Sequence, residues 1–175
     1  EKTFSFTPAF WMYVHRYLLK DVFTHAGKIR TYNIYKNEWV LNGKSVFYAS
    51  YDSIPMTMEY DFKTEAAFSY KNLSKDDIRR HLAQFTSDIW QIHPFGEGNT
   101  RSTAVFIIKY LSSLGYSINQ ECFAKKSWYF RNALVRANYN DLPNDIHATT
   151  LYLESFFENL LFGGNNELKN RYLHI

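Results

Sequence analysis

The sequence has almost no cysteine, no long apolar run and no strong excess of either charge. Cys122 is the only cysteine, so a disulfide framework and a cysteine-built zinc site are both excluded, and a reduced thiol in a cytosolic compartment is expected. The longest apolar run, residues 104–108, is far too short to span a bilayer. No secretory signal opens the chain, although its abrupt start at Glu1 leaves room for an upstream segment. These absences predict a soluble, cytoplasmic protein.

Charge and composition narrow the class further. The net charge is only +3, with the Lys and Arg residues scattered, which is a weak argument for specific nucleic-acid binding and no argument for a membrane partner. With 175 residues, of which 46% are hydrophobic and 19% aromatic, the chain can fill a sizeable core. No repeat or linker divides it. We therefore expect one domain over residues 1–175, with a core at roughly residues 10–160 and a C-terminal tail at 163–175.

Helical patterns dominate the chain. Pro8 favours a helix that runs to about His25, with an apolar side made of Phe10, Val14, Tyr17, Leu18 and Val22. Ser74 and Asp77 resemble a capping box, and the helix after them carries a core-facing stripe of Ile78, Leu82, Phe85, Ile89 and Ile92. Pro94 ends it. Further helices are expected over residues 100–114, 120–138 and 145–161, with a short one in 167–175.

One segment has a different pattern. The stretch "WVLNGKSVFY", residues 39–48, places β-branched and aromatic residues on both sides of Asn42-Gly43, the pair that favours a tight hairpin turn. It is the only strong strand signal. The expected fold class is therefore mainly α with a single inserted β-hairpin.

The densest group of reactive residues is "HPFGEGNTR", residues 93–101, between two expected helices. The second helix presents unpaired N–H groups at its N-terminus. Gly96 and Gly98 allow the loop to curl so that further N–H groups point the same way and form an anion-binding nest. Arg101 adds a cationic fork suited to phosphate oxygens, and the amide of Asn99 can donate to the same phosphate.

Two further residues of this stretch suggest metal binding and proton transfer. Glu97 would repel an anion, but Mg²⁺ between a carboxylate and substrate phosphates removes the conflict. His93 can take a proton from a hydroxyl. The residues thus favour a nucleotide pocket that moves a phosphate-containing group onto an alcohol. From the residues alone, the alternative of a simple turn with a capping or core histidine stays equally open.

Several other site types find no support in the sequence. The remaining histidines show no metal-ligand spacing such as a helical HExxH, so packing is the default for each of them. No Walker lysine loop and no nucleophile elbow is present.

The stretch "HPFGEGNTR" resembles the signature H-P-F-x-[D/E]-G-N-[G/K]-R of the Fic (filamentation induced by cAMP) family, and it matches every fixed position except one. The upstream "HRYLLKDVFTHAGKIRTYNI", residues 15–34, is similar to the helix and "AGKIR" stretch that precede the flap hairpin of that family. The similarity covers roughly residues 10–159. Fic proteins typically transfer AMP from ATP to a Ser, Thr or Tyr hydroxyl of a target protein.

The resemblance implies a role for each residue of the loop. His93 would be the catalytic base, Phe95 a buried anchor and Glu97 the ligand of Mg²⁺. The nucleotide phosphates would be held by Gly96, Gly98, Asn99, Thr100 and Arg101. Lys36, Asn132 and Tyr139 are further candidates near the nucleotide, and the hairpin around Asn42-Gly43 would be the flap that aligns the target by strand addition.

Two residues depart from the family pattern. Thr100 stands where Gly or Lys is common; it keeps the backbone N–H, and its hydroxyl is expected to cap the new helix. Ala104 stands where many AMP-transferring members have a second arginine, so a positive charge is missing. The alternatives are a different phosphate-containing donor, removal of AMP, or a non-catalytic nucleotide-binding module.

Two glutamates are candidates for an inhibitory role. Many members carry an inhibitory helix with [S/T]-x-x-x-E-[G/N]. Glu158 in "ESFFEN" and Glu154 in the frame from Thr150 are imperfect matches. A solvated helix face with Phe156 and Phe157 packed inward is the favoured interpretation. An inhibitory segment before Glu1 or a separate antitoxin partner is the other alternative.

Overall fold

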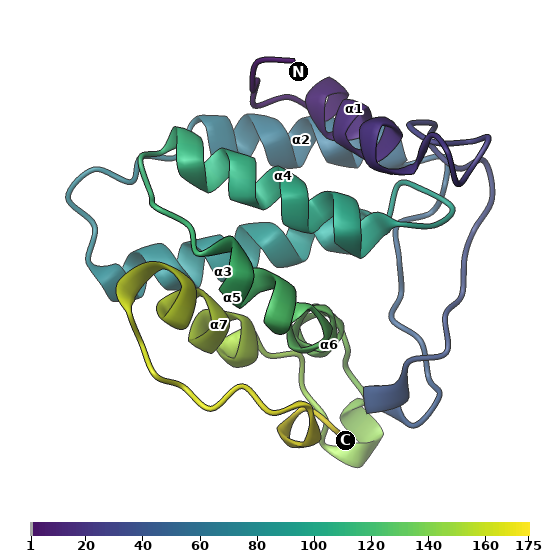
Figure 1. The fold of residues 1–175 in the computed structure, drawn as a ribbon. Helices are drawn as coiled ribbons and strands as arrows, with labels where there is room; N and C mark the ends of the chain where they lie inside the picture. Colours follow the sequence, from purple (N-terminus) through teal and green to yellow (C-terminus); the bar gives the residue numbers. More distant parts are fainter. Residues whose placement is uncertain (1) are drawn as a thin grey trace. The chain divides into compact units, whose positions relative to one another are not determined.

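The computed structural model describes residues 2–175, which are mainly helical (Figure 1). The chain forms two compact units. The first contains the described residues up to Ile34 together with Tyr48–Ser69 and Asp88–Ser117, and the second contains Tyr35–Phe47, Tyr70–Ser87 and Ile118–Ile175. The expectation of a single domain stays a prediction. Among residues 2–175, no helix combines the length and the hydrophobicity needed to cross a bilayer.

The first unit contains α1 (Pro8–Leu19), α2 (Ile54–Ala66), α4 (Asn99–Ser113) and the end of α3 (Lys75–Ile92). Helix α1 begins after Thr7, whose hydroxyl accepts a hydrogen bond from the Phe10 N–H at 3.1 Å, and it packs against α2 and α4. Its buried face contributes Trp11, whose ring lies 6.1 Å from Phe62 of α2 and 6.2 Å from Phe106 of α4. These rings form the centre of an aromatic core.

The second unit contains α5 (Gln120–Lys125), α6 (Ser127–Ala137), α7 (Leu151–Phe162) and most of α3. Short 3-10 turns occupy Trp39–Leu41, Leu142–Asn144 and Asn170–Tyr172. Helix α6 packs against α5 and α7, with the Phe130 ring 5.0 Å from that of Phe156. Phe156 and Phe157 are both fully buried, so their predicted inward packing is confirmed.

Helix α3 follows the sequence prediction closely. The Asp77 N–H donates to the Ser74 hydroxyl at 3.1 Å, and that hydroxyl donates to the Asp77 carboxylate at 2.6 Å. The predicted cap by Ser74 is therefore confirmed, but the second bond comes from the Ser74 hydroxyl and not from its backbone N–H, as a full capping box requires. The predicted apolar stripe is also buried along its whole length, at Ile78, Leu82, Phe85, Ile89 and Ile92.

The predicted β-hairpin was wrong. No strand occurs in residues 2–175 beyond an isolated bridge between Asp141 and Ile146. Asn42 and Gly43 do adopt the positive φ values of a turn, 53° and 84°, but the arms form no ladder. The Glu38 N–H donates to the Lys44 carbonyl at 3.0 Å beside the turn, and the Lys36 N–H donates to the Ser45 hydroxyl at 3.1 Å.

Other predicted boundaries also need correction. The first helix ends at Leu19 rather than near His25. The helix expected over 120–138 is broken at Lys126, and the one expected over 145–161 begins only at Leu151. The tail expected to be helical forms a single 3-10 turn. Helix α2 was missed, although its buried residues recur at helical spacing: Ile54, Met58, Phe62 and Glu65.

An acidic pair between α2 and α3 yields a stability prediction. Burial, with a smaller contribution from Asp88, raises the pKa of Asp61 to about 6. The folded state therefore holds a proton that the unfolded chain releases, so stability falls as pH rises from 3.8 toward 6. We expect Asp61→Asn to raise the free energy of unfolding by about 1 kcal/mol above this range and to give no gain below it. Denaturant titrations below pH 3.8 and above pH 6 measure the free energy of unfolding of Asp61→Asn, with the exposed Asp21→Asn as the control. An equal gain from Asp61→Asn on both sides of this range would contradict the prediction.

Candidate functional site

The stretch "HPFGEGNTR" forms the loop between α3 and α4 in the first unit, together with the first turn of α4. Helix α3 ends at Ile92, immediately before His93, as Pro94 predicts. His93 has a positive φ of 48°, a conformation that costs a residue other than glycine energy and that occurs preferentially at functional sites. Gly98 has φ 77°, and a Cβ there would also collide with Leu19. The loop therefore requires glycine at this position.

The His93 side chain is held in a defined orientation. Only 3% of the residue is exposed, and its Nδ1 lies 2.9 Å from the carbonyl oxygen of Trp90. A carbonyl oxygen can only accept a hydrogen bond, so Nδ1 carries the proton. In the neutral ring the lone pair then lies on Nε2. The rings of Tyr48 and Trp90 lie 4.0 and 4.7 Å from the imidazole. This arrangement presents a basic nitrogen in a largely apolar surrounding.

Arg30 fastens the start of the loop. It is 4% exposed, and its guanidinium donates to carbonyl oxygens of His93 at 2.7 Å and Ile92 at 3.3 Å. The same group donates to Tyr32 and Ala49, and the Arg30 N–H donates to Pro94. Carbonyl oxygens at the C-terminus of a helix carry partial negative charge. The cation thus pairs with the end of α3 instead of with a carboxylate.

Phe95 and Asn99 close the middle of the loop. Phe95 is fully buried, as predicted, with its ring stacked on His15 at 3.8 Å. The Phe95 N–H donates to the Asn99 side-chain oxygen at 2.9 Å, and the Asn99 amide donates to the Phe95 carbonyl at 2.7 Å. Asn99 is buried, and its side chain shapes the loop. Its predicted contact with a phosphate stays a prediction.

His15 supports the far side of the loop from α1. The Gly27 N–H donates to its Nδ1 at 2.8 Å, so Nε2 carries the proton and donates to the Glu97 carbonyl, also at 2.8 Å. Burial lowers the pKa of His15, and nearby His25 acts in the same direction, whereas the bond to Glu97 opposes them. A neutral ring with both nitrogens bonded therefore joins α1, the turn at Gly27 and the loop.

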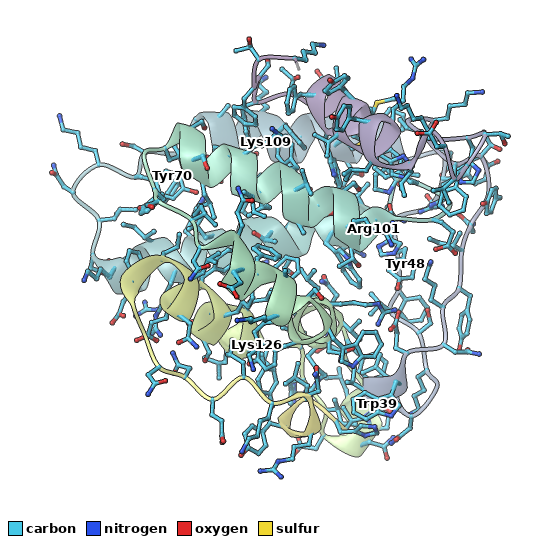
Figure 2. All side chains as sticks on the ribbon, in the orientation of Figure 1. Trp39, Tyr48, Tyr70, Arg101, Lys109 and Lys126 are labelled. Atoms are coloured by element: carbon cyan, nitrogen blue, oxygen red, sulfur yellow. The ribbon has the colours of Figure 1, made fainter. Side chains whose placement is uncertain are left out.

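Arg101 and Glu97 are exposed at the surface of the site. The first helical bond of α4 runs from the Ser102 N–H to the Gly98 carbonyl, so the N–H groups of Asn99, Thr100 and Arg101 have no partner within the helix. The Arg101 side chain has no ion-pair partner among the described residues, and it projects at the start of α4 (Figure 2). A cationic group and unpaired donors thus meet at one point.

Thr100 does not cap α4 as predicted. Gly98 is the N-cap and no side chain caps the helix. The Thr100 hydroxyl accepts instead from the Trp90 indole N–H at 2.9 Å. Gly96 lies against Tyr32: a Cβ at this glycine would stand 2.6 Å from the Tyr32 hydroxyl. The absence of a side chain at Gly96 therefore makes room for that tyrosine.

The other candidate nucleotide residues lie in the second unit. The Asn132 amide nitrogen donates to the Asn170 side chain at 2.8 Å, and the residue is fully buried. Tyr139 is also buried and donates to Asp141 at 3.4 Å. Lys36 lies in the segment before the turn at Asn42-Gly43. The roles of Lys36, Asn132 and Tyr139 at a nucleotide stay predictions.

The two candidate inhibitory glutamates also lie in the second unit, on α7. Glu158 forms an ion pair with Arg79 at 2.8 Å and accepts from Asn166 at 3.1 Å. Contrary to the expected solvated face, Glu154 is only 7% exposed, and it accepts from the Thr150 hydroxyl at 2.8 Å. Both carboxylates thus have partners within their own unit, and an inhibitory role for either one stays a prediction.

The helical fold and the loop identify the protein class. The model of the Fic/DOC family matches residues 5–111, and the chain belongs to this family. The match includes α1, Arg30 and the whole loop of residues 93–101, whereas Asn132 and Tyr139 lie outside it.

Individual relatives agree with this assignment. The probable protein adenylyltransferase y4lH of Sinorhizobium fredii is 27% identical over 130 residues, which are 74% of this chain and 64% of the relative. The protein adenylyltransferase VbhT of Bartonella schoenbuchensis is 26% identical over 106 residues, which are 61% of this chain and 21% of VbhT. The chain thus spans less than two thirds of either relative.

A solved structure shows the same fold. The BepC protein of Bartonella tribocorum, a VirB-translocated Bartonella effector with bound AMPPNP, superposes with a TM-score of 0.67 at 18% identity, covering 89% of this chain and 74% of BepC. The mainly helical fold predicted from the sequence is therefore shared with BepC, and the family match identifies it as the Fic type.

Proposed function

We propose that this chain transfers AMP from ATP to a Ser, Thr or Tyr hydroxyl of a target protein. The observation that carries the proposal is the His93 ring, whose Nδ1 donates to Trp90 and whose lone pair lies on Nε2. Membership of the Fic/DOC family supports it, as do two relatives named as protein adenylyltransferases and a structural relative solved with AMPPNP.

The chemical step uses His93 as a general base. The target oxygen forms a bond to the α-phosphorus of ATP, while the bond from that phosphorus to the bridging oxygen of the leaving pyrophosphate breaks. The hydroxyl proton passes to Nε2, and pyrophosphate departs with the electron pair. The imidazolium that forms keeps its bond from Nδ1 to the Trp90 carbonyl, which stabilises the new positive charge.

The phosphates would lie at the start of α4. The unpaired N–H groups of its first turn and the exposed Arg101 supply donors and positive charge. The exposed carboxylate of Glu97 fits Mg²⁺, which takes one carboxylate together with phosphate oxygens and waters. Bound there, Mg²⁺ would neutralise phosphate charge. The target segment would lie along residues 35–47, the segment that the family resemblance marks as the flap.

A second candidate uses the same base with another phosphate-containing donor. Ala104 favours it, because this position, one turn after Arg101 on α4, carries no charge. The family resemblance implies that a second arginine at this position contacts the terminal phosphate of ATP. A donor that lacks a γ-phosphate would not need that contact.

Labelled ATP tests whether the chain transfers AMP or the γ-phosphate of ATP. The chain is incubated with Mg²⁺, a cell lysate and ATP labelled at either the α- or the γ-phosphate. We expect protein-bound α-label without γ-label. Label from the γ-phosphate alone would indicate phosphorylation and contradict AMP transfer. Absence of both labels would contradict AMP transfer from ATP. It would favour a non-catalytic nucleotide-binding module if calorimetry shows tight binding of ATP, and the second candidate if ATP binds weakly.

A further inference from the structure

The hydroxyl of Thr100 is tied to a residue at the other end of the loop. It accepts a hydrogen bond from the Trp90 indole N–H at 2.9 Å, which links the first turn of α4 to the last turn of α3. Trp90 is 1% exposed, so its indole N–H cannot turn to water if this acceptor is lost. A buried donor without a partner is unfavourable, and the bond therefore fixes the angle of the indole ring.

Trp90 in turn contacts the imidazole of His93 in two ways. The indole ring meets the imidazole edge to face, with centroids 4.7 Å apart and an interplanar angle of 89°. The Trp90 carbonyl accepts from Nδ1 at 2.9 Å. Tyr48 completes the group, because its ring lies 5.7 Å from Trp90 and 4.0 Å from His93. A rotation of the indole would therefore change the packing on which the angle of the imidazole depends.

We propose that Thr100 is a positioning residue that orients His93 through Trp90. This role rests on the transfer chemistry proposed above. Neither glycine nor lysine, the residues common at this position of the signature, has a side chain that can accept the indole N–H. Threonine at position 100 thus adds a hydrogen bond that fixes the orientation of Trp90 and, through it, of His93. The backbone N–H of residue 100, which would face a phosphate, is retained.

Nuclear magnetic resonance tests the positioning without any transfer. Thr100→Val keeps the shape and removes the acceptor, so we expect the Trp90 indole N–H and the His93 ring resonances both to shift. Thr100→Ser keeps the acceptor and should leave the Trp90 indole resonance near its original place. The matched control is Thr103→Val on the same helix, because the buried Thr103 hydroxyl has no hydrogen-bond partner among the described residues. Unmoved His93 resonances in Thr100→Val would overturn the proposal.

Kinetics supplies the second test. We expect Thr100→Val to lower kcat by about 10- to 100-fold with KM for ATP unchanged, because the base is misplaced while nucleotide contacts persist. Trp90→Phe removes the donor, and the double variant should lose little more than either single one. Fully additive losses, or an unchanged kcat in both single variants, would overturn the proposal. If the wild-type chain transfers nothing, the proposed function fails, while the resonance shifts still decide the contact between Thr100, Trp90 and His93.

Discussion

Replacing His93 with alanine is expected to lower the rate of AMP transfer by at least about a hundredfold, the usual contribution of a general base. Nε2 is the proton acceptor in the proposed step, and the chain holds it there by a bond from Nδ1 to the Trp90 carbonyl. Alanine removes both. The measurement is the initial rate of protein labelling from α-labelled ATP at saturating nucleotide.

Nucleotide affinity separates a lost base from a lost pocket. Arg101, Glu97 and the first turn of α4 remain in His93→Ala, so calorimetric binding of ATP with Mg²⁺ should change little. His93→Gln serves as the control for packing, because it nearly preserves volume and lacks a basic nitrogen. Transfer undiminished in both variants would exclude His93 as the base.

Replacing Arg30 with methionine is expected to lower the free energy of unfolding by about 3 kcal/mol, because buried and half-buried carbonyl oxygens lose a charged donor at once. The guanidinium bonds the carbonyls of Ile92 and His93 as well as those of Tyr32 and Ala49. Methionine fills similar space and donates to none of them. Denaturant titration measures the loss, and transfer should fall as well because the start of the loop is released.

The matched control for Arg30 is Arg80→Met. The Arg80 side chain is 59% exposed and forms only a loose ion pair with Asp77 at 3.6 Å, so a loss below about 1 kcal/mol is expected. Equal losses in the free energy of unfolding of Arg30→Met and Arg80→Met would contradict the prediction. They would mean that the bonds from Arg30 to carbonyl oxygens stabilise the fold no more than an exposed arginine does.

Local patterns predicted the helices of this chain best where a periodic stripe and a cap coincided. Helix α3 has both, and its start, end and buried face were all predicted. The apolar side of the first predicted helix was partly misassigned. Tyr17 of α1 and Val22, which lies beyond the end of α1, are 59% and 65% exposed, whereas Trp11 and His15 are buried. Because α1 carries aromatic residues on several sides, its sequence alone does not show which side is buried. Packing against α2 and α4 determines the buried side.

The hairpin shows a different limit. Asn42 and Gly43 adopt the turn conformation that their identities favour, but a ladder needs paired backbone groups on both arms. Here the Lys36 N–H, one of the donors of the first arm, bonds the Ser45 side chain. Turn chemistry is local and was predictable, whereas strand pairing depends on how the arms are bonded and was not.

The candidate site was predictable where its residues are contiguous. The reactive side chains of residues 93–101 follow one another in the sequence, and the structure places them in one loop and the first turn of α4. Arg30, His15 and Trp90, which hold that loop, were not assigned these roles, because their partners lie up to 82 positions away. The one available signal was the spacing of four that places Trp11, His15 and Leu19 on one side of α1.

The most direct test of the central claim, that the loop presents Nε2 of His93 as a base, is the tautomer of that ring. Nitrogen-15 chemical shifts of the His93 imidazole distinguish a protonated Nδ1 from a protonated Nε2 in the neutral ring, with His93→Ala used to assign the signals. The bond to the Trp90 carbonyl predicts a proton on Nδ1 and none on Nε2. A neutral ring with its proton on Nε2 would contradict the proposed role, because the nitrogen assigned to take the target's proton would already carry one.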